Sequence, residues 1–254
     1  MLVYWSKAQK KGKISEPTSP SPMRRLQLID EFFLYCCRSA AGLKEKVLAD
    51  IFQVSVSTVC RIVITRANYL YLVFASLPIW MSRQQVQSTM PLKFWQYSPD
   101  VRVIIDCTEV RCQSPSSLTL QSEVFSSYKN TTTFKGLIGI APFGAVTFVS
   151  NLYTGSISDR ELTERCGILN LLEPGDGCMA DKGFTIEKML ADHGAKLIIP
   201  PFKTTAIRRV KEYLIWDNTI PITLSGTINQ LWTNCCLMTN FQGPLDLKGH
   251  IPVA

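Results

Sequence analysis

Two aspartates that follow apolar runs are the residues in this sequence whose type and spacing point most directly to chemistry. Asp106 comes after four β-branched residues within residues 101–105, and Asp181 comes after the run "GCMA" at residues 177–180. A buried carboxylate is costly unless a cation compensates its charge. Asp106 also has a simpler interpretation, a solvated strand end, because strands often stop on a turn-forming Asp.

Carboxylates held close together favour a divalent metal ion. Mg²⁺ takes oxygen ligands and keeps several waters. Two such ions about 4 Å apart can activate an attacking hydroxyl and stabilise a leaving one in phosphoryl transfer. We therefore expect Asp106 and Asp181 to converge in space and to bind Mg²⁺ or Mn²⁺, although 75 residues separate them in the sequence.

The elements that must position these acids are strands, which begin at residue 101. Residues 101–107 form one expected strand, and the alternating pattern predicts further strands at 117–125, 132–142 and 144–153. A helix is expected at 158–172, with Ser158 as its N-cap and Glu161 three residues later. A short strand up to Asp181, a helix closed by Gly194 and a strand over 195–202 complete the order. Strands in series, then a helix, then a strand ending in a second acid match a ribonuclease-H-like α/β arrangement.

The N-terminal region has helical spacing instead. Residues 26–39 place apolar side chains at helical intervals, and residues 43–74 contain two apolar helical runs separated by a short turn. Ser55 can N-cap the second run. In a helix-turn-helix the start of that second helix enters the major groove. Ser57, Thr58 and Arg61 would then face DNA, while Val56, Val59 and Ile62 face the core. An ordinary helical hairpin would give the same spacing.

The charge distribution agrees with a DNA-binding N-terminal module. The formal net charge is +7, and residues 1–100 carry 13 Lys and Arg against 6 Asp and Glu, whereas residues 101–254 carry 14 of each kind. This asymmetry favours a nucleic-acid partner, although a soluble basic surface would show it too. We expect residues 1–25 to be a disordered basic and Pro/Ser-rich linker, residues 26–100 the helical module and residues 101–254 the nuclease-like domain.

Composition excludes several other classes. No apolar run approaches the roughly 18 residues of a membrane span, and the basic N-terminal residues are not a secretory signal, so we expect an intracellular protein without a membrane partner. The nine cysteines form no C-x-x-C pair and only two histidines accompany them. A structural zinc site is therefore not expected, and the cysteines are interpreted as free thiols.

Several segments of the sequence resemble a known protein family. The segments "VIIDCTEV" at 103–110, "GSISD" at 155–159, "MADKGF" at 179–184 and "IPPF" at 199–202 resemble the DDE superfamily endonuclease domain of PIF/Harbinger-type transposases and their domesticated relatives. The resemblance extends to "VSVSTVCRI" at 54–62 and to residues 220–245. It implies a metal-dependent nuclease acting on duplex DNA in the nucleus, with Asp106 and Asp181 as its first two catalytic acids and Asp159 supporting the metal site.

The chain departs from that family at the third carboxylate. The family carries a catalytic Glu in a helix after "IPPF". By this resemblance the chain is internally shortened near 203–208, so that residues resembling the stretch after that Glu follow almost at once. Glu212 is the one downstream acid with a helical setting that could substitute. By resemblance, however, it matches a residue about two turns beyond the catalytic Glu, and the alternative is a surface charge.

Three functions follow as hypotheses. The first is a transposase-derived, Mg²⁺- or Mn²⁺-dependent endonuclease-like protein that is weakly active or inactive. The second is a non-catalytic protein that binds DNA or a DNA-binding protein partner. Both hypotheses are compatible with a homo-oligomer. The third is a truncated gene-model or splice product.

Overall fold

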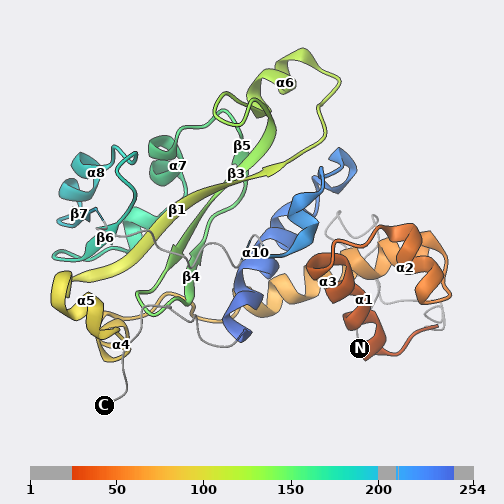
Figure 1. Cartoon of the computed structure of the whole chain (residues 1–254), viewed down its shortest axis with the longest axis horizontal. Helices are drawn as coiled ribbons and strands as arrows, with labels where there is room; N and C mark the ends of the chain where they lie inside the picture. The colour runs from red at the N-terminus through yellow and green to blue at the C-terminus, as the bar shows by residue number, and fades with distance from the viewer. Residues whose placement is uncertain (1–24, 200–209, 211, 243–254) are drawn as a thin grey trace, which may run out of the picture.

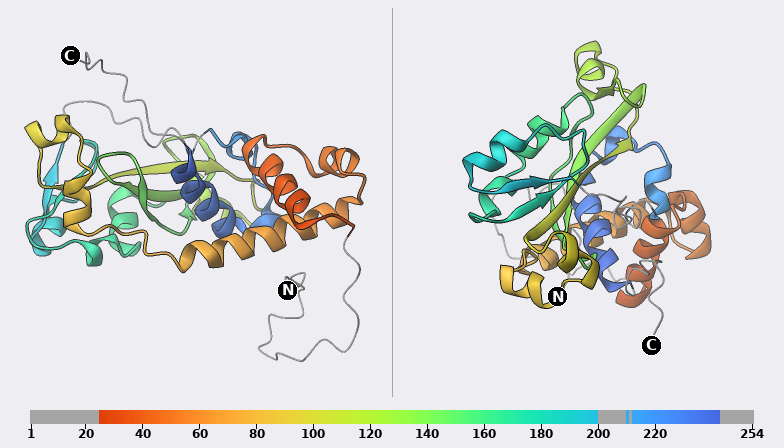
Figure 2. Two further views of the ribbon diagram at one scale, coloured as in Figure 1. Left: turned by 90° about the horizontal axis from the view of Figure 1, so that it is seen from below. Right: turned by 60° about the vertical axis from the view of Figure 1, so that its left-hand side comes forward.

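The computed structural model describes residues 25–199, 210 and 212–242. Figure 1 shows an elongated molecule with N-terminal helices at one end and a sheet at the other, and Figure 2 shows the long helix α3 running between them. The expected linker at 1–25 and the expected shortening near 203–208 lie outside the described residues, apart from Arg25. The predictions for these two segments therefore stay predictions.

Five helices precede the sheet. They are α1 (Leu28–Ala40), α2 (Glu45–Ile51), α3 (Val56–Ala75), α4 (Arg83–Ser88) and α5 (Leu92–Tyr97). The predicted N-cap of α3 is confirmed, because the Ser55 hydroxyl accepts a hydrogen bond from the Thr58 backbone N–H at 3.2 Å. The expected inward residues are only partly confirmed. Val59 and Ile62 are buried, but Val56 is 42% exposed because the first turn of α3 extends beyond the packed core.

The second half of the chain forms one mixed sheet with helices on it, which is consistent with the predicted ribonuclease-H-like fold. The strand order is β2-β3-β1-β6-β7, with β4 and β5 also pairing with β3. The central strand β1 is antiparallel to β3 and parallel to β6. The strands are β1 (Val101–Arg111), β2 (Phe125–Ser126), β3 (Thr131–Ile140), β4 (Val146–Val149), β5 (Tyr153–Thr154), β6 (Gly177–Met179) and β7 (Lys196–Ile198).

Short helices connect and follow these strands. They are α6 (Leu118–Val124), α7 (Asp159–Arg165), η2 (Ile168–Leu171), α8 (Glu187–Asp192), η3 (Leu214–Asp217), η4 (Ile222–Leu224), α10 (Ile228–Met238) and η5 (Thr239–Phe241). The Ser158 hydroxyl caps α7 by accepting from the Glu161 N–H at 3.1 Å, as predicted. Gly194 follows α8 with φ of +70°, the left-handed conformation that favours glycine.

Three predicted strands are wrong in extent or type, and one of them, at 144–153, is divided into the short strands β4 and β5. Residues 117–125 form mainly α6, because Leu118 and Leu120 are 81% and 51% exposed and their alternation buries no common face. The strand expected at 101–107 runs on to Arg111, because β3 supplies an antiparallel partner as far as Thr133. Asp106 therefore lies in the middle of β1 and not at its end.

The two faces of the sheet pack against different layers. One face carries Ile104, Ile138 and Met179 and belongs to a core cluster with Trp232 of α10 and residues of α1 and α3. The other face carries Val103, Ile105 and Leu137 and packs with Leu162 of α7 and Leu190 of α8. Because side chains alternate along β1 from Val103 onward, the parity of a residue in that part of the strand tells which layer it faces.

The long helix α3 passes a length and hydropathy test for a membrane span, although the core helix of a soluble protein passes the same test. Its inward face packs against α1, α2 and α10. It also carries Arg66, whose guanidinium lies 2.6 Å from the buried Glu31 carboxylate. These contacts are those of a core helix.

Candidate functional site

The pairing of β1 with β6 places the two predicted catalytic aspartates at equivalent positions. Ile104 pairs with Met179 in this parallel pair, and Asp106 and Asp181 each lie two residues further along. Adjacent strands are about 4.8 Å apart. The register therefore favours the predicted convergence of the two acids.

The alternation of side chains along β1 and β6 also supports the convergence of the two aspartates. Met179 belongs to the cluster on the α10 face, whereas Ala180 belongs to the cluster on the α7 and α8 face. Ala180 continues the strand geometry, since its N–H donates to the Ile198 carbonyl at 3.1 Å. Continued alternation directs residue 181 to the α10 face, which is also the face of Asp106 because Asp106 pairs with Ile138.

The two aspartates differ in their surroundings. Asp106 is half-buried within β1, whereas Asp181 is exposed in the turn after β6. One carboxylate oxygen of Asp181 accepts from the Lys182 N–H at 2.7 Å, and its carbonyl accepts from the Phe184 N–H at 3.0 Å. These bonds hold the turn and leave the other carboxylate oxygen of Asp181 without a hydrogen bond in the described residues.

Asp159, predicted to support the metal, lies on the opposite face of the sheet. It is the first residue of α7, and its Oδ1 is 2.5 Å from the Nζ of Lys135. Lys135 pairs with Glu109 across β1 and β3 and also donates to the Ile157 carbonyl at 3.2 Å. Glu109 is an odd-numbered and Asp106 an even-numbered residue of β1, so their side chains point to opposite faces of the sheet. Asp159 pairs with Lys135 beside Glu109 and therefore does not lie on the face of Asp106. Its metal role stays a prediction.

The cluster around Lys135 was not anticipated from the sequence. Glu109 accepts from the Thr133 hydroxyl at 2.8 Å and lies 4.0 Å from Lys135. Burial and the nearby Asp159 carboxylate raise the pKa of the adjacent Cys107 thiol, so this cysteine stays protonated. The signal was present in the sequence: Glu109 and Lys135 are charged residues inside otherwise apolar strands.

Glu212 lies in an exposed turn before η3. The residue after it, Tyr213, packs in the cluster shared by α1, α3 and α10. Within residues 25–199, 210 and 212–242, no group of three or more His, Cys, Asp and Glu side chains is arranged to hold a metal. Glu212 thus does not complete a three-acid group with Asp106 and Asp181 here.

The predicted DNA-facing residues lie at the start of α3. Ser57 and Arg61 are exposed, and Thr58 is half-buried. The Thr58 and Ser57 hydroxyls both contact the Ser55 hydroxyl, at 2.8 and 2.9 Å, so part of this polar set serves the N-cap. Arg61, one turn beyond Ser57, is the cation that this helix presents to solvent near its start.

The charge of the helical module itself is smaller than that of residues 1–100 as a whole. Residues 25–100 contain eight Lys and Arg against five Asp and Glu, a net of three positive charges. One of these cations, Arg66, forms a buried ion pair with Glu31 and is not exposed for contact with DNA. Electrostatic attraction to DNA from this module therefore depends on a few exposed side chains.

Comparison with protein families finds one match, and it lies in the sheet-forming half of the chain. Residues 105–204 match a DDE superfamily endonuclease domain. The match begins at Ile105, covers Asp106, Asp159 and Asp181, and ends shortly after β7. The DDE endonuclease family acts on DNA and generally uses divalent metal ions. No curated protein matches the chain.

The described residues fit the DDE metal site only in part. Asp106 and Asp181 are the oxygen donors that Mg²⁺ and Mn²⁺ take, and the register aligns them. A third carboxylate is not gathered with them among the described residues. Two carboxylates leave more of the coordination shell of a divalent ion to water.

Proposed function

We propose that this protein is a transposase-derived, DDE-endonuclease-like protein that binds duplex DNA in the nucleus and cleaves it weakly or not at all. The observation that carries the proposal is the register of β1 and β6, which aligns Asp106 with Asp181 inside the matched domain. The missing third acid in the described residues supports the low activity.

The role of the aspartates is to hold a divalent cation with modest affinity. Phosphoryl transfer depends on holding metal ions in a fixed geometry, and two carboxylates constrain an ion less than three. We expect the full chain to bind Mn²⁺ weakly, and Asp106→Ala to weaken that binding by about tenfold or more. Titration calorimetry measures both, and Asp192→Ala, which removes an exposed acid from the end of α8, is the matched control.

Cleavage is tested by nicking of a supercoiled plasmid with Mg²⁺ or Mn²⁺. We expect little nicking by the chain, none by Asp106→Ala, and a gain when a helix carrying a family-like Glu is inserted before Arg208. Robust nicking by the unmodified chain that disappears in both Asp106→Ala and Glu212→Ala would overturn the proposal, because Glu212 would then be the third ligand.

Duplex binding is assigned to the exposed start of α3. Arg61→Ala in the full chain should weaken binding to duplex DNA and reduce the dependence of log affinity on log salt by about one unit, because one phosphate contact is lost. Fluorescence anisotropy at several salt concentrations gives this slope. Arg165→Ala is the control, since Arg165 is an exposed cation of α7 on the other half of the molecule. Equal slopes for Arg61→Ala and the parent would remove the assigned role of α3.

A second candidate is a non-catalytic protein that uses the fold to bind DNA or a DNA-binding protein. The absence of a three-acid group among the described residues favours it. It differs from the first candidate in the metal titration. A non-catalytic binder that has lost its metal site would show the same Mn²⁺ binding before and after Asp106→Ala.

A further inference from the structure

The side of α3 that α1 covers continues beyond the start of α1 as an exposed apolar surface. Arg66 lies on this side, because its guanidinium donates to the Leu28 carbonyl of α1 at 3.4 Å. Tyr69, Val73 and Leu77 follow Arg66 at helical spacing, so they lie on the same side of the helix. Arg66 is 5% exposed, whereas these three side chains are 41%, 38% and 49% exposed. The cover that α1 provides therefore ends at Arg66, and no described element replaces it further along.

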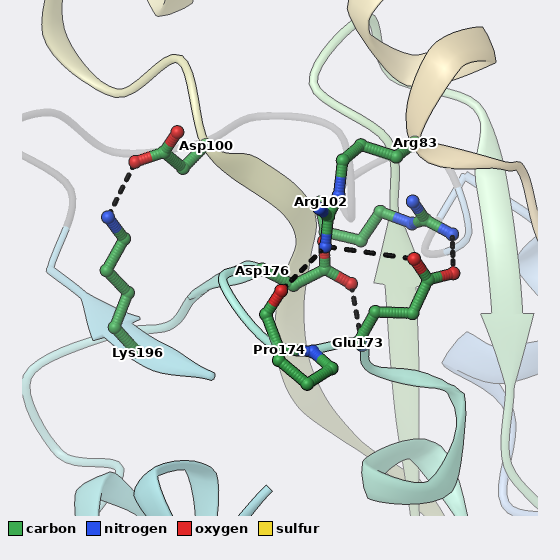
Figure 3. Close-up of polar contacts among 7 residues, drawn as sticks. All are labelled: Arg83, Asp100, Arg102, Glu173, Pro174, Asp176 and Lys196. Atoms are coloured by element: carbon green, nitrogen blue, oxygen red, sulfur yellow. Dashed lines mark hydrogen bonds and ion pairs between the residues drawn. The ribbon is translucent and has the colours of Figure 1, made fainter. Parts of the chain in front are cut away.

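Together with the neighbouring Leu72, which is 58% exposed, these three residues form a surface that we call the α3 stripe. The sequence contains no charged residue between Arg66 and Arg83. Arg66 has its carboxylate partner on α1. Arg83 lies 2.8 Å from the carboxylate of the buried Asp176, and Figure 3 shows this pair beside the buried Arg102. The stripe is thus apolar and uncharged, which is typical of a surface that packs against an apolar segment.

The part of the chain that precedes α1 arrives where this cover ends. Leu26 packs against the core shared by α1 and α3, and α1 begins at Leu28, beside Arg66. Residues 1–24 lie upstream of this point, outside the described residues. Their longest apolar run is "MLVYW" at residues 1–5, which includes two large aromatic side chains.

The connecting segment is long enough to bring this run to the stripe. A flexible chain as long as residues 6–27 has a root-mean-square end-to-end distance of about 25 Å. The α3 stripe, from Tyr69 to Leu77, is about 12 Å long at the helical rise per residue. Residues 1–5 can therefore reach any part of the stripe.

We propose that residues 1–5 pack on the α3 stripe of their own chain and extend the cover that α1 begins. The run is continuous, whereas the apolar residues of 243–254, the segment that follows η5, are separated by glycine, proline and charged residues. This packing holds the four lysines of residues 7–13 beside the helical module. The inference does not depend on the function proposed above.

The test is photo-cross-linking of the full chain with p-benzoyl-phenylalanine in place of Trp5. Trypsin cleaves after Arg66 and Arg83, so the whole stripe is recovered in one peptide, residues 67–83. We expect the cross-links from position 5 to fall mainly on this peptide. A mixture of ¹⁵N-labelled and unlabelled chains should give products within one chain and no mixed products.

A variant of the stripe shows whether the contact is specific. Val73→Glu should lower the yield of the cross-link by about tenfold, because the contact of one apolar side chain is lost. Leu72→Glu repeats the test at a more exposed position. The matched control is Val47→Glu on α2, which replaces a valine that is 42% exposed and should leave the yield unchanged. Circular dichroism checks that each variant is folded like the parent.

The other possible occupants of the stripe give different products. Cross-links between labelled and unlabelled chains would overturn the proposal and assign the stripe to a second copy. Cross-links to residues 67–83 from a probe at Leu247, but not from position 5, would overturn it and assign the stripe to residues 243–254. Position 5 giving no cross-link to this peptide, or equal yields in Val73→Glu and Val47→Glu, would overturn it as well.

Discussion

At the scale of single residues, the ion pair between Glu31 and Arg66 is the most enclosed charge pair of the helical module. The side chains are 0% and 6% exposed, and the oxygen and nitrogen are 2.6 Å apart. Removing one member of such a pair leaves an uncompensated buried charge, which costs far more than the pair contributes.

We therefore expect Glu31→Ala to lower the free energy of unfolding by about 3–5 kcal/mol. Urea denaturation of the full chain measures the change. The matched control is Glu161→Ala, which breaks an exposed pair with Arg165 and should cost about 1 kcal/mol or less. Similar losses for the two variants would mean that the Glu31 carboxylate is solvated in solution.

Also at this scale, the thiol of Cys60 has a pKa raised to about 11, first by burial and then by its hydrogen bond to Glu45. A raised thiol pKa keeps the thiolate scarce below pH 11, so alkylation by iodoacetamide should keep accelerating up to that pH. Glu45→Gln removes the negative charge and should lower the pKa of Cys60 and speed its alkylation near pH 9. Peptide mapping by mass spectrometry follows this cysteine alone. An unchanged rate in Glu45→Gln would contradict the assigned contact.

At the scale of elements, the start of α3 depends on a single hydroxyl. Ser55 accepts from the Thr58 N–H, satisfying one of the donors that every helix start leaves unpaired. Ser55→Ala should lower the free energy of unfolding by about 1 kcal/mol. Ser57→Ala is the control within the same turn and should stay within about 0.5 kcal/mol of the parent, because Ser57 is an exposed residue whose hydroxyl contacts only the Ser55 hydroxyl among the bonds described. Equal effects would mean that the cap is not formed in solution.

At the scale of the whole molecule, the helical module and the sheet share a core. One cluster contains residues of α1, α3, β1 and α10, including Tyr35, Ile104 and Trp232. The buried Asn234 of α10 donates to the Tyr35 hydroxyl at 3.0 Å and to the Ala67 carbonyl at 2.9 Å. The helical module is therefore completed by a helix that begins more than 150 residues after the end of α3.

From this shared core we expect the full chain to unfold in one cooperative transition, and residues 25–100 alone to be largely unfolded. A fragment without α10 exposes the apolar side chains that α10 covers, and each buried large side chain is worth about 1.5–3 kcal/mol. Circular dichroism in a urea gradient tests both statements. Two separated transitions, or a cooperatively folded fragment, would show that the module is independent.

The sequence by itself determined the features that depend on near neighbours. Helix caps at Ser55 and Ser158, the glycine after α8 and the order of most elements follow from local hydrogen bonding and periodicity, and they are as predicted. The two apolar runs that lead into Asp106 and Asp181 are also local patterns. These runs identified Asp106 and Asp181, the two acids that the register of β1 and β6 aligns in the structure.

Only the tertiary structure decided the features that depend on distant partners. β1 continues past Asp106 because β3 pairs with it, and residues 117–125 turn into α6 because no strand covers their apolar side chains. The pairing of Asp159 with Lys135 and the enclosure of Arg102 likewise depend on residues far along the chain. Periodicity reports which side chains share a face of one element, but the identity of the element packed against that face is set by the free energy of the whole fold.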